Sequence, residues 1–173
     1  MELQILDALQ KIHTPVIDTL MCGITRLGDA GMIWILLCVV LLLMPKTRKS
    51  GIILLAGLLA DLLICNVILK PVVQRIRPFD VMTEIELLVK RPLDYSFPSG
   101  HTAASFTSVM ALYLAGEKKL WKLALMLAVL IAFSRLYLYV HYPTDVLGGV
   151  IIGVVSGALG YWLVKKSEEV AGA

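Results

Sequence analysis

Residues 51–69 read GIILLAGLLADLLICNVIL, a run in which Asp61 is the only charged side chain. Because about 20 apolar residues in a helix cross a bilayer core of roughly 30 Å, this stretch predicts a transmembrane helix. Four further apolar runs resemble it: Ala30–Met44, Thr102–Ala115, Leu123–Val140 and Val146–Val164. With 58% hydrophobic residues and a mean hydropathy of +0.83, the chain is too apolar for an ordinary soluble domain. We expect an all-α, polytopic transmembrane helix bundle of about five spans, forming a single domain over residues 1–173.

Residues 1–26 differ from these runs because charged and apolar side chains are mixed along them. The polar members are Glu2, Asp7, Lys11, His13, Asp18 and Arg26. This pattern predicts an amphipathic segment that lies in the membrane interface. It lacks the basic start and uninterrupted apolar core of a cleavable signal, so we expect it to stay in the mature protein.

The connections between the runs fall on alternating sides of the membrane. One side holds the short basic segments Pro45–Ser50 and Gly116–Lys122 and the tail from Lys165. The positive-inside rule makes this side cytoplasmic. The loop of residues 71–99 and residues 141–145 then face outward from the cytoplasmic (plasma) membrane. The outward side also carries several cations, so an undetermined topology is the alternative.

Three polar segments interrupt the apolar chain at the outward ends of the runs. They read KPVVQRIRP at residues 70–78, PSGH at 98–101 and SRLYLYVHYPTD at 134–145. Since the predicted topology puts all three on one face, they can meet in one site. Lys70, Arg77 and Arg135 would supply positive charge for a phosphate group, and arginine can bind two of its oxygens at once.

The PSGH segment would complete the phosphate-binding set. Ser99 adds a hydroxyl, and Gly100 lets a ligand approach the backbone at the start of a helix, where free amides and the helix dipole attract anions. Each residue also has a plainer interpretation. Lys70 could be an interfacial anchor with its charge in the headgroups, and Ser99 a helix N-cap. Arg135 is the exception, because an arginine within an apolar run implies a partner or a function.

Two histidines and a carboxylate add reactive groups. His141 and Asp145 are four residues apart across a turn that contains Pro143. Asp145 can accept a hydrogen bond from one ring nitrogen of His141 and direct the other at phosphorus as a nucleophile. His101 would then protonate the leaving oxygen as general acid. We expect no metal and no other cofactor, because the surrounding cations disfavour a divalent ion.

Several other polar residues and glycines could be mistaken for site residues, and we predict structural or surface roles for them. Arg75 is predicted to be a headgroup or surface contact, whereas the family resemblance described next assigns the phosphate ligand to Arg77 by its spacing from Lys70. Asp61 and Asn66 are predicted to form hydrogen bonds between helices. Glycines at 149, 153 and 157 recur on one helical face, which predicts close packing of helices within the chain rather than dimerisation.

The three segments resemble the signature of the type 2 phosphatidic acid phosphatase family of integral membrane lipid phosphatases. That signature is Lys-x6-Arg-Pro, Pro-Ser-Gly-His and Ser-Arg-x5-His-x3-Asp, and this sequence matches every position. The resemblance implies a haloperoxidase-like helical core, a phosphohistidine intermediate on His141 supported by Asp145, and no metal requirement. It assigns His101 as acid or base. It also implies that phosphate is held by Lys70, Arg77, Ser99, Gly100 and Arg135.

The expected reaction is hydrolysis of a phosphate or diphosphate from a membrane lipid. The resemblance suggests undecaprenyl diphosphate, phosphatidylglycerophosphate or phosphatidic acid as substrate, with lipid A 1-phosphate removal as an alternative. A phosphorylated-lipid binding or transport protein without turnover is a second class, although pure binding needs no oriented nucleophile. Five apolar spans disfavour a soluble vanadium haloperoxidase, which shares the motifs. The expected partners are the lipid substrate and the bilayer, with no nucleic acid and no obligatory protein partner.

Overall fold

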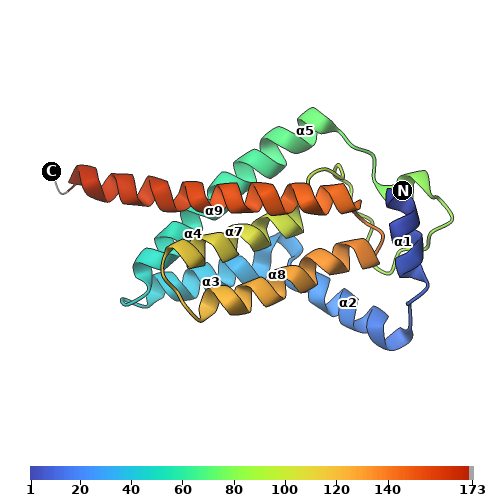
Figure 1. Cartoon of the computed structure of the whole chain (residues 1–173), viewed down its shortest axis with the longest axis horizontal. Coiled ribbons are helices and arrows are strands. Elements are labelled where there is room, and N and C mark those ends of the chain that lie inside the picture. Colours follow the sequence, from blue (N-terminus) through green and yellow to red (C-terminus); the bar gives the residue numbers. More distant parts are fainter. Residues whose placement is uncertain (172–173) are drawn as a thin grey trace.

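The computed structural model describes residues 1–171, and every regular element within that range is a helix, as predicted. Figure 1 shows long helices side by side, with the N-terminal helices gathered at one end. The elements are α1 (Glu2–Gln10), α2 (Pro15–Leu27), the short η1 (Asp29–Gly31), α3 (Met32–Leu43), α4 (Arg48–Asp61), η2 (Leu62–Leu69), α5 (Lys70–Val73), α6 (Pro78–Val81), α7 (Gly100–Leu114), α8 (Leu120–Tyr137) and α9 (Pro143–Ala171).

The helices differ in whether they are long and apolar enough to cross a membrane. The stretch Arg48–Val81, α8 and α9 qualify singly, and α2 with η1 and α3 qualifies if the two halves form one span bent by 46°. α7 has 15 residues, fewer than the roughly 20 of a full span. All five predicted runs are therefore helical, while the total of five spans stays a prediction.

Two helix ends differ from those predicted. The helix predicted over residues 51–69 continues beyond Leu69 to Val73, although Pro71 has no backbone N–H to donate to an ordinary helical hydrogen bond. The preceding η2 is a π-helix, whose wider turn changes the hydrogen-bond pattern before the proline. α8 stops at Tyr137 instead of Val140, because Tyr139 adopts a left-handed conformation with φ of 59°.

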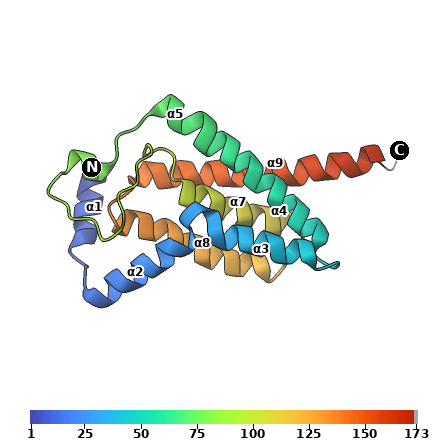
Figure 2. The same cartoon turned by 180° about the vertical axis from the view of Figure 1, so that it is seen from behind.

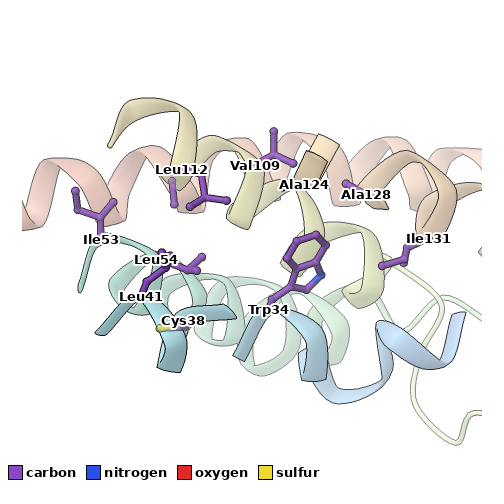
Figure 3. Packing of buried hydrophobic residues seen from close by; sticks show 11 residues of the cluster. Trp34, Cys38, Leu41, Ile53, Leu54, Val109, Leu112, Ala124, Ala128 and Ile131 are labelled. Atoms are coloured by element: carbon purple, nitrogen blue, oxygen red, sulfur yellow. The ribbon is translucent and has the colours of Figure 1, made fainter. Parts of the chain in front are cut away.

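The hydrophobic core joins α3, α4, α7 and α8. Figure 3 shows Trp34 of α3 among aliphatic side chains of the other helices. The indole is 1% exposed, and its Nε1 donates a hydrogen bond to Ser105 Oγ of α7 at 2.9 Å. This bond satisfies the one polar atom of a large buried ring and fixes α3 against α7 below the site.

The glycine repeat of α9 sets the register between α9 and α7. A Cβ at Gly149 would lie 2.7 Å from Ser99 O, one at Gly153 2.4 Å from Ala103 O, and one at Gly157 2.6 Å from Thr107 O. The three pairs advance together along both helices, so α7 and α9 run parallel, as Figure 2 shows from behind. The predicted packing within the chain is confirmed. It places the start of α7 beside the start of α9, with Ser99 N donating to Asp145 O at 3.1 Å.

Hydrogen bonds and a ring stack hold the N-terminal segment against the end of α8 and the residues that follow it. Tyr139 Oη donates to Asp7 Oδ1 at 2.7 Å, and Tyr137 Oη donates to Asp18 Oδ1 at 2.6 Å. His13 stacks on Tyr137 with ring centroids 4.1 Å apart. Polar side chains of this segment thus contact two tyrosines of the third motif segment. The prediction of an interfacial helix did not include these contacts.

Candidate active site

The three motif segments come together at one end of the bundle. Lys70 lies at the end of the helix that began as α4, Arg135 near the end of α8, and Asp145 in the first turn of α9. Gly100 and His101 open α7 beside them. Every site residue predicted from the sequence therefore belongs to this end of the fold.

His141, the predicted nucleophile, has one ring nitrogen near a carboxylate and the other near a guanidinium. Its Nδ1 lies 3.6 Å from Asp145 Oδ2, longer than a hydrogen bond, and its Nε2 lies 3.3 Å from Arg77 Nη1. The ring is 2% exposed. Burial first of all, together with the positive charges of Arg77 and Arg135, lowers the pKa of His141 to about 3. A nucleophilic histidine must be neutral, as this low pKa favours.

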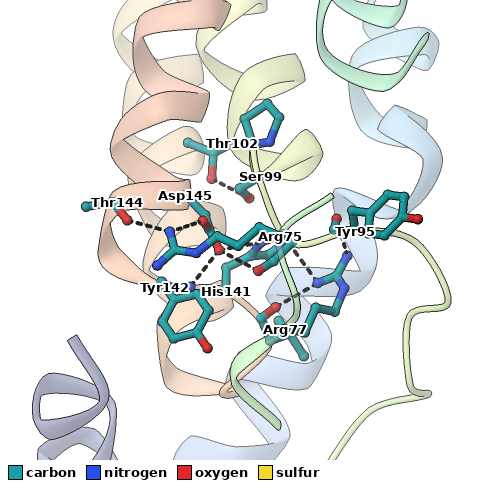
Figure 4. A network of polar contacts seen from close by, with 12 residues as sticks. Arg75, Arg77, Tyr95, Ser99, Thr102, His141, Tyr142, Thr144 and Asp145 are labelled. Atoms are coloured by element: carbon teal, nitrogen blue, oxygen red, sulfur yellow. Dashed lines mark hydrogen bonds and ion pairs between the residues drawn. The ribbon is translucent and has the colours of Figure 1, made fainter. Parts of the chain in front are cut away.

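Asp145 is enclosed by hydrogen-bond donors, as Figure 4 shows. Its Oδ2 accepts from the backbone N of Tyr142 at 2.9 Å and from Ser96 Oγ, and its Oδ1 accepts from Arg75 Nη1 at 2.6 Å. These contacts hold the carboxylate plane beside the His141 ring.

Two of the predicted phosphate ligands share a carboxylate from the long loop. Arg77 donates from Nη2 to Asp94 Oδ1 at 2.7 Å and from Nε to Asp94 O at 2.8 Å, and Lys70 Nζ donates to Asp94 Oδ2. Partial burial alone would raise the pKa of Asp94, but Lys70 and Arg77 outweigh it and lower the pKa to about 2. Asp94 is thus an anion bound by the cations that the sequence assigns to phosphate.

Arg135 and His101 form the opposite side of the site. Arg135 is 4% exposed, and its Nη1 donates to Thr25 Oγ1 of α2 and lies 3.4 Å from His101 Nε2. The same His101 nitrogen is 2.9 Å from Asp29 Oδ1 in η1. The predicted general acid therefore has a carboxylate partner that lies outside the three motifs.

Ser99 and Gly100 have different positions. The Ser99 side chain is fully buried, and its Oγ accepts a hydrogen bond from Thr102 Oγ1 at 3.0 Å. Gly100 faces the site, since a Cβ there would lie 3.6 Å from Lys70 Nζ. Ser99 does not line the cavity described below, although its own hydroxyl proton stays free to donate, whereas Gly100 lines it and leaves the backbone accessible.

A cavity of about 1170 Å³ joins these residues to the apolar faces of α3 and α4. Its polar end is lined by six of the eight predicted site residues: Lys70, Arg77, Gly100, His101, Arg135 and His141. Its apolar end is lined by residues such as Ile35, Val39, Leu55, Leu59 and Leu62. Asp61 and Asn66 also line it, and Asp61 Oδ1 finds no hydrogen-bond partner among residues 1–171, so the predicted bond between helices is missing there.

Sequence reasoning missed three charged residues near the site. Asp94 and Asp29 lie outside the motifs, and no spacing rule marks them. Arg75 was predicted to contact headgroups or the surface, and this is wrong: it forms ion pairs with Asp145 at 2.6 Å and with Glu2 at 2.7 Å. Only the three-dimensional path of the chain brings these charges together.

The comparisons with known proteins agree with the fold and the motifs. The family model described as the PAP2 superfamily matches residues 50–169, which is most of the chain. The protein therefore belongs to the PAP2 superfamily, as its three signature segments predict. Apolar helices and membrane-embedded relatives together identify an integral membrane protein.

Two sequence relatives and one solved structure show the similarity in detail. An undecaprenyl-diphosphatase from Sulfolobus acidocaldarius is 37% identical over 121 residues, which cover 70% of this chain and 58% of that protein. An undecaprenyl-diphosphatase from Bacillus subtilis is 33% identical over 151 residues, covering 85% of this chain and 75% of the relative. The crystal structure of a transmembrane PAP2-type phosphatidylglycerolphosphate phosphatase from Bacillus subtilis has a TM-score of 0.74 at 33% identity, covering 96% of this chain and 83% of that one. The relatives are phosphatases, and the fold is shared.

Proposed function

We propose that this protein hydrolyses a phosphate or diphosphate group from a membrane lipid. The observation that carries the proposal is the position of His141: its two ring nitrogens face Asp145 and Arg77, beside a cavity that is cationic at one end and apolar at the other. The names of the relatives point to the same kind of reaction. Residues 1–173 would act as a single membrane-embedded lipid phosphatase domain.

In the first step, His141 Nε2 attacks phosphorus. A P–N bond forms while the bond between phosphorus and the leaving oxygen breaks, and His101 gives that oxygen a proton. Asp145 stabilises the positive charge that develops on the His141 ring. Lys70 and Arg77 neutralise the equatorial phosphate oxygens together with Arg135, Ser99 and the Gly100 backbone. Water, deprotonated by His101, then displaces His141 and releases phosphate.

The apolar end of the cavity supports a substrate whose tail stays in the bilayer. Ile35, Val39, Leu55 and Leu59 would contact hydrocarbon while the phosphate reaches Lys70 and Arg77. The candidates are undecaprenyl diphosphate, phosphatidylglycerophosphate and phosphatidic acid, and a lipid A phosphate is the alternative. The mechanism needs no metal.

The proposed location is the cytoplasmic membrane, with the site on the extracytoplasmic side. The support is the charge of the opposite end of the bundle, where the segments 45–50 and 116–122 are short and basic. A cysteine or a protease site introduced into the 82–93 loop should be modified or cleaved by a reagent added outside intact cells. Modification from the cytoplasmic side would contradict this orientation.

The test of function is phosphate release by the purified protein in detergent with EDTA. The candidate lipids are undecaprenyl diphosphate, phosphatidylglycerophosphate and phosphatidic acid, and His141→Ala is the control. We expect turnover that the control abolishes, and the preferred lipid identifies the substrate. Lipid binding without turnover would instead indicate a binding or transport protein.

A further inference from the structure

Arg75 stands between the proposed catalytic carboxylate and the N-terminal helix. Its Nη1 donates to Asp145 Oδ1 and to Thr144 Oγ1, both at 2.6 Å, and its Nη2 donates to Glu2 Oε2 at 2.7 Å. The guanidinium also lies 4.0 Å from the centre of the Tyr142 ring. Figure 4 shows it on the opposite side of Asp145 from His141. One guanidinium thus contacts three residues of the turn that carries His141.

Arg75 holds the oxygen of Asp145 that faces away from His141. Oδ2 lies 3.6 Å from His141 Nδ1 and is held by Tyr142 N and Ser96 Oγ. Oδ1 has Arg75 as its hydrogen-bond partner among residues 1–171. A carboxylate held at both oxygens cannot rotate about its Cβ–Cγ bond, so Arg75 completes the fixing of Asp145. The pair is also well shielded, since Asp145 is fully buried and the Arg75 side chain is 27% exposed.

Glu2 extends this arrangement to α1. Its Oε1 accepts from the backbone N of Thr144 at 3.1 Å and from Thr144 Oγ1 at 2.7 Å, while Oε2 accepts from Arg75. The Glu2 carboxylate therefore binds both Arg75 and the first turn of α9. Hydrogen bonds to these donors outweigh its partial burial and lower the pKa of Glu2, which keeps it charged.

Arg75 does not belong to the phosphate-binding set. The cavity is lined by Lys70, Arg77 and Arg135 but not by Arg75, whose donors already bind Asp145, Thr144 and Glu2. Arg75 and Arg77 lie two residues apart on non-helical chain, and they serve the carboxylate and the anion site respectively.

We propose that Arg75 is a positioning residue that fixes Asp145 for its contact with His141, and that Glu2 of the N-terminal helix holds Arg75 in place. This inference rests on the proposed function, because it assigns Asp145 a part in phosphate-ester hydrolysis. It makes α1 part of the support of the active site. Removing residues that orient metal ligands in other proteins usually costs roughly 10- to 100-fold in activity, and we expect a loss of similar size here.

The experiment compares Arg75→Gln, Arg75→Lys, Glu2→Gln and the control Arg48→Gln with the wild type. Arg48 is an exposed arginine at the other end of the bundle. The readouts are kcat and KM on the lipid that the wild type hydrolyses, the inhibition constant of inorganic phosphate, and Tm in detergent. We expect Arg75→Gln to lower kcat about 10- to 100-fold, with KM and phosphate inhibition nearly unchanged. Arg75→Lys should recover part of kcat, because a lysine keeps the charge but cannot bridge both carboxylates.

A double-mutant cycle separates positioning from general loss of structure. If Arg75 acts through Asp145, adding Arg75→Gln to Asp145→Asn should lower the residual activity little further. Multiplicative losses would overturn the inference, as would a folded Arg75→Gln protein with unchanged kcat. Weakened phosphate inhibition would also overturn it, because that result assigns Arg75 to the anion site. Absence of wild-type turnover on every lipid would instead refute the proposed function.

Discussion

Asp94 forms ion pairs with both Lys70 and Arg77, the proposed phosphate ligands, so we expect that replacing Asp94 strengthens phosphate binding. Asp94→Asn keeps the shape of the side chain but removes the charge that the two cations share. One pKa unit corresponds to about 1.4 kcal/mol, so the lowering of the Asp94 pKa from 3.8 to about 2 would represent roughly 2.5 kcal/mol. The side chain is 51% exposed, and solvent screening reduces this to about 1 kcal/mol.

A loss of about 1 kcal/mol of competition corresponds to roughly fivefold tighter anion binding. The assay is inhibition by inorganic phosphate and KM for the lipid substrate, at neutral pH and low salt. Glu84→Gln is the matched control, because Glu84 is an exposed carboxylate of the same loop. An Asp94→Asn protein with weaker phosphate inhibition would refute competition and show that Asp94 organises the two cations instead.

Three further predictions concern packing, pH and the leaving group. Gly153→Ala should destabilise the protein by about 1–3 kcal/mol, because its Cβ would lie 2.4 Å from Ala103 O, whereas Gly23→Ala, with open space around it, should not; Tm in detergent checks both. Because the pKa of Asp94 is lowered to about 2, the stabilisation from its contact with Lys70 and Arg77 should be complete above pH 4 and lost as pH falls through 2. The rate of proteolysis of the loop, measured as a function of pH, checks this. His101→Ala should slow leaving-group release from an alkyl phosphate about 10²- to 10⁴-fold, but the initial burst of p-nitrophenol from p-nitrophenyl phosphate much less, since that leaving group needs no proton and the burst precedes the step in which His101 deprotonates water.

Hydropathy was sufficient to predict the helices because an apolar run of membrane length has few alternatives to a helix. The glycine spacing at 149, 153 and 157 also predicted close packing, since a bare helical face permits backbone contact. Helix ends were harder. Pro143 marks a break only after the predicted end at Val140, whereas the chain leaves α8 earlier, at Tyr139, where neither Gly nor Pro lies.

The grouping of the candidate site residues followed from topology, whereas their charged partners did not. Lys70, His101 and Asp145 lie at helix ends, and alternating spans put those ends on one face. Asp94 and Arg75 lie on irregular chain, so their contacts depend on the path of the loop and on the docking of α1. A sequence shows such charges but not which opposite charge each one meets.

The most direct test of the central claim is rapid quenching of the reaction into alkali, followed by mass spectrometry of the peptide that contains His141. We expect a transient phosphoryl group on His141 that forms before free phosphate appears and is absent from His141→Ala. Release of phosphate with no phosphorylated His141 at any time point would contradict it, because water would then attack the lipid phosphate directly.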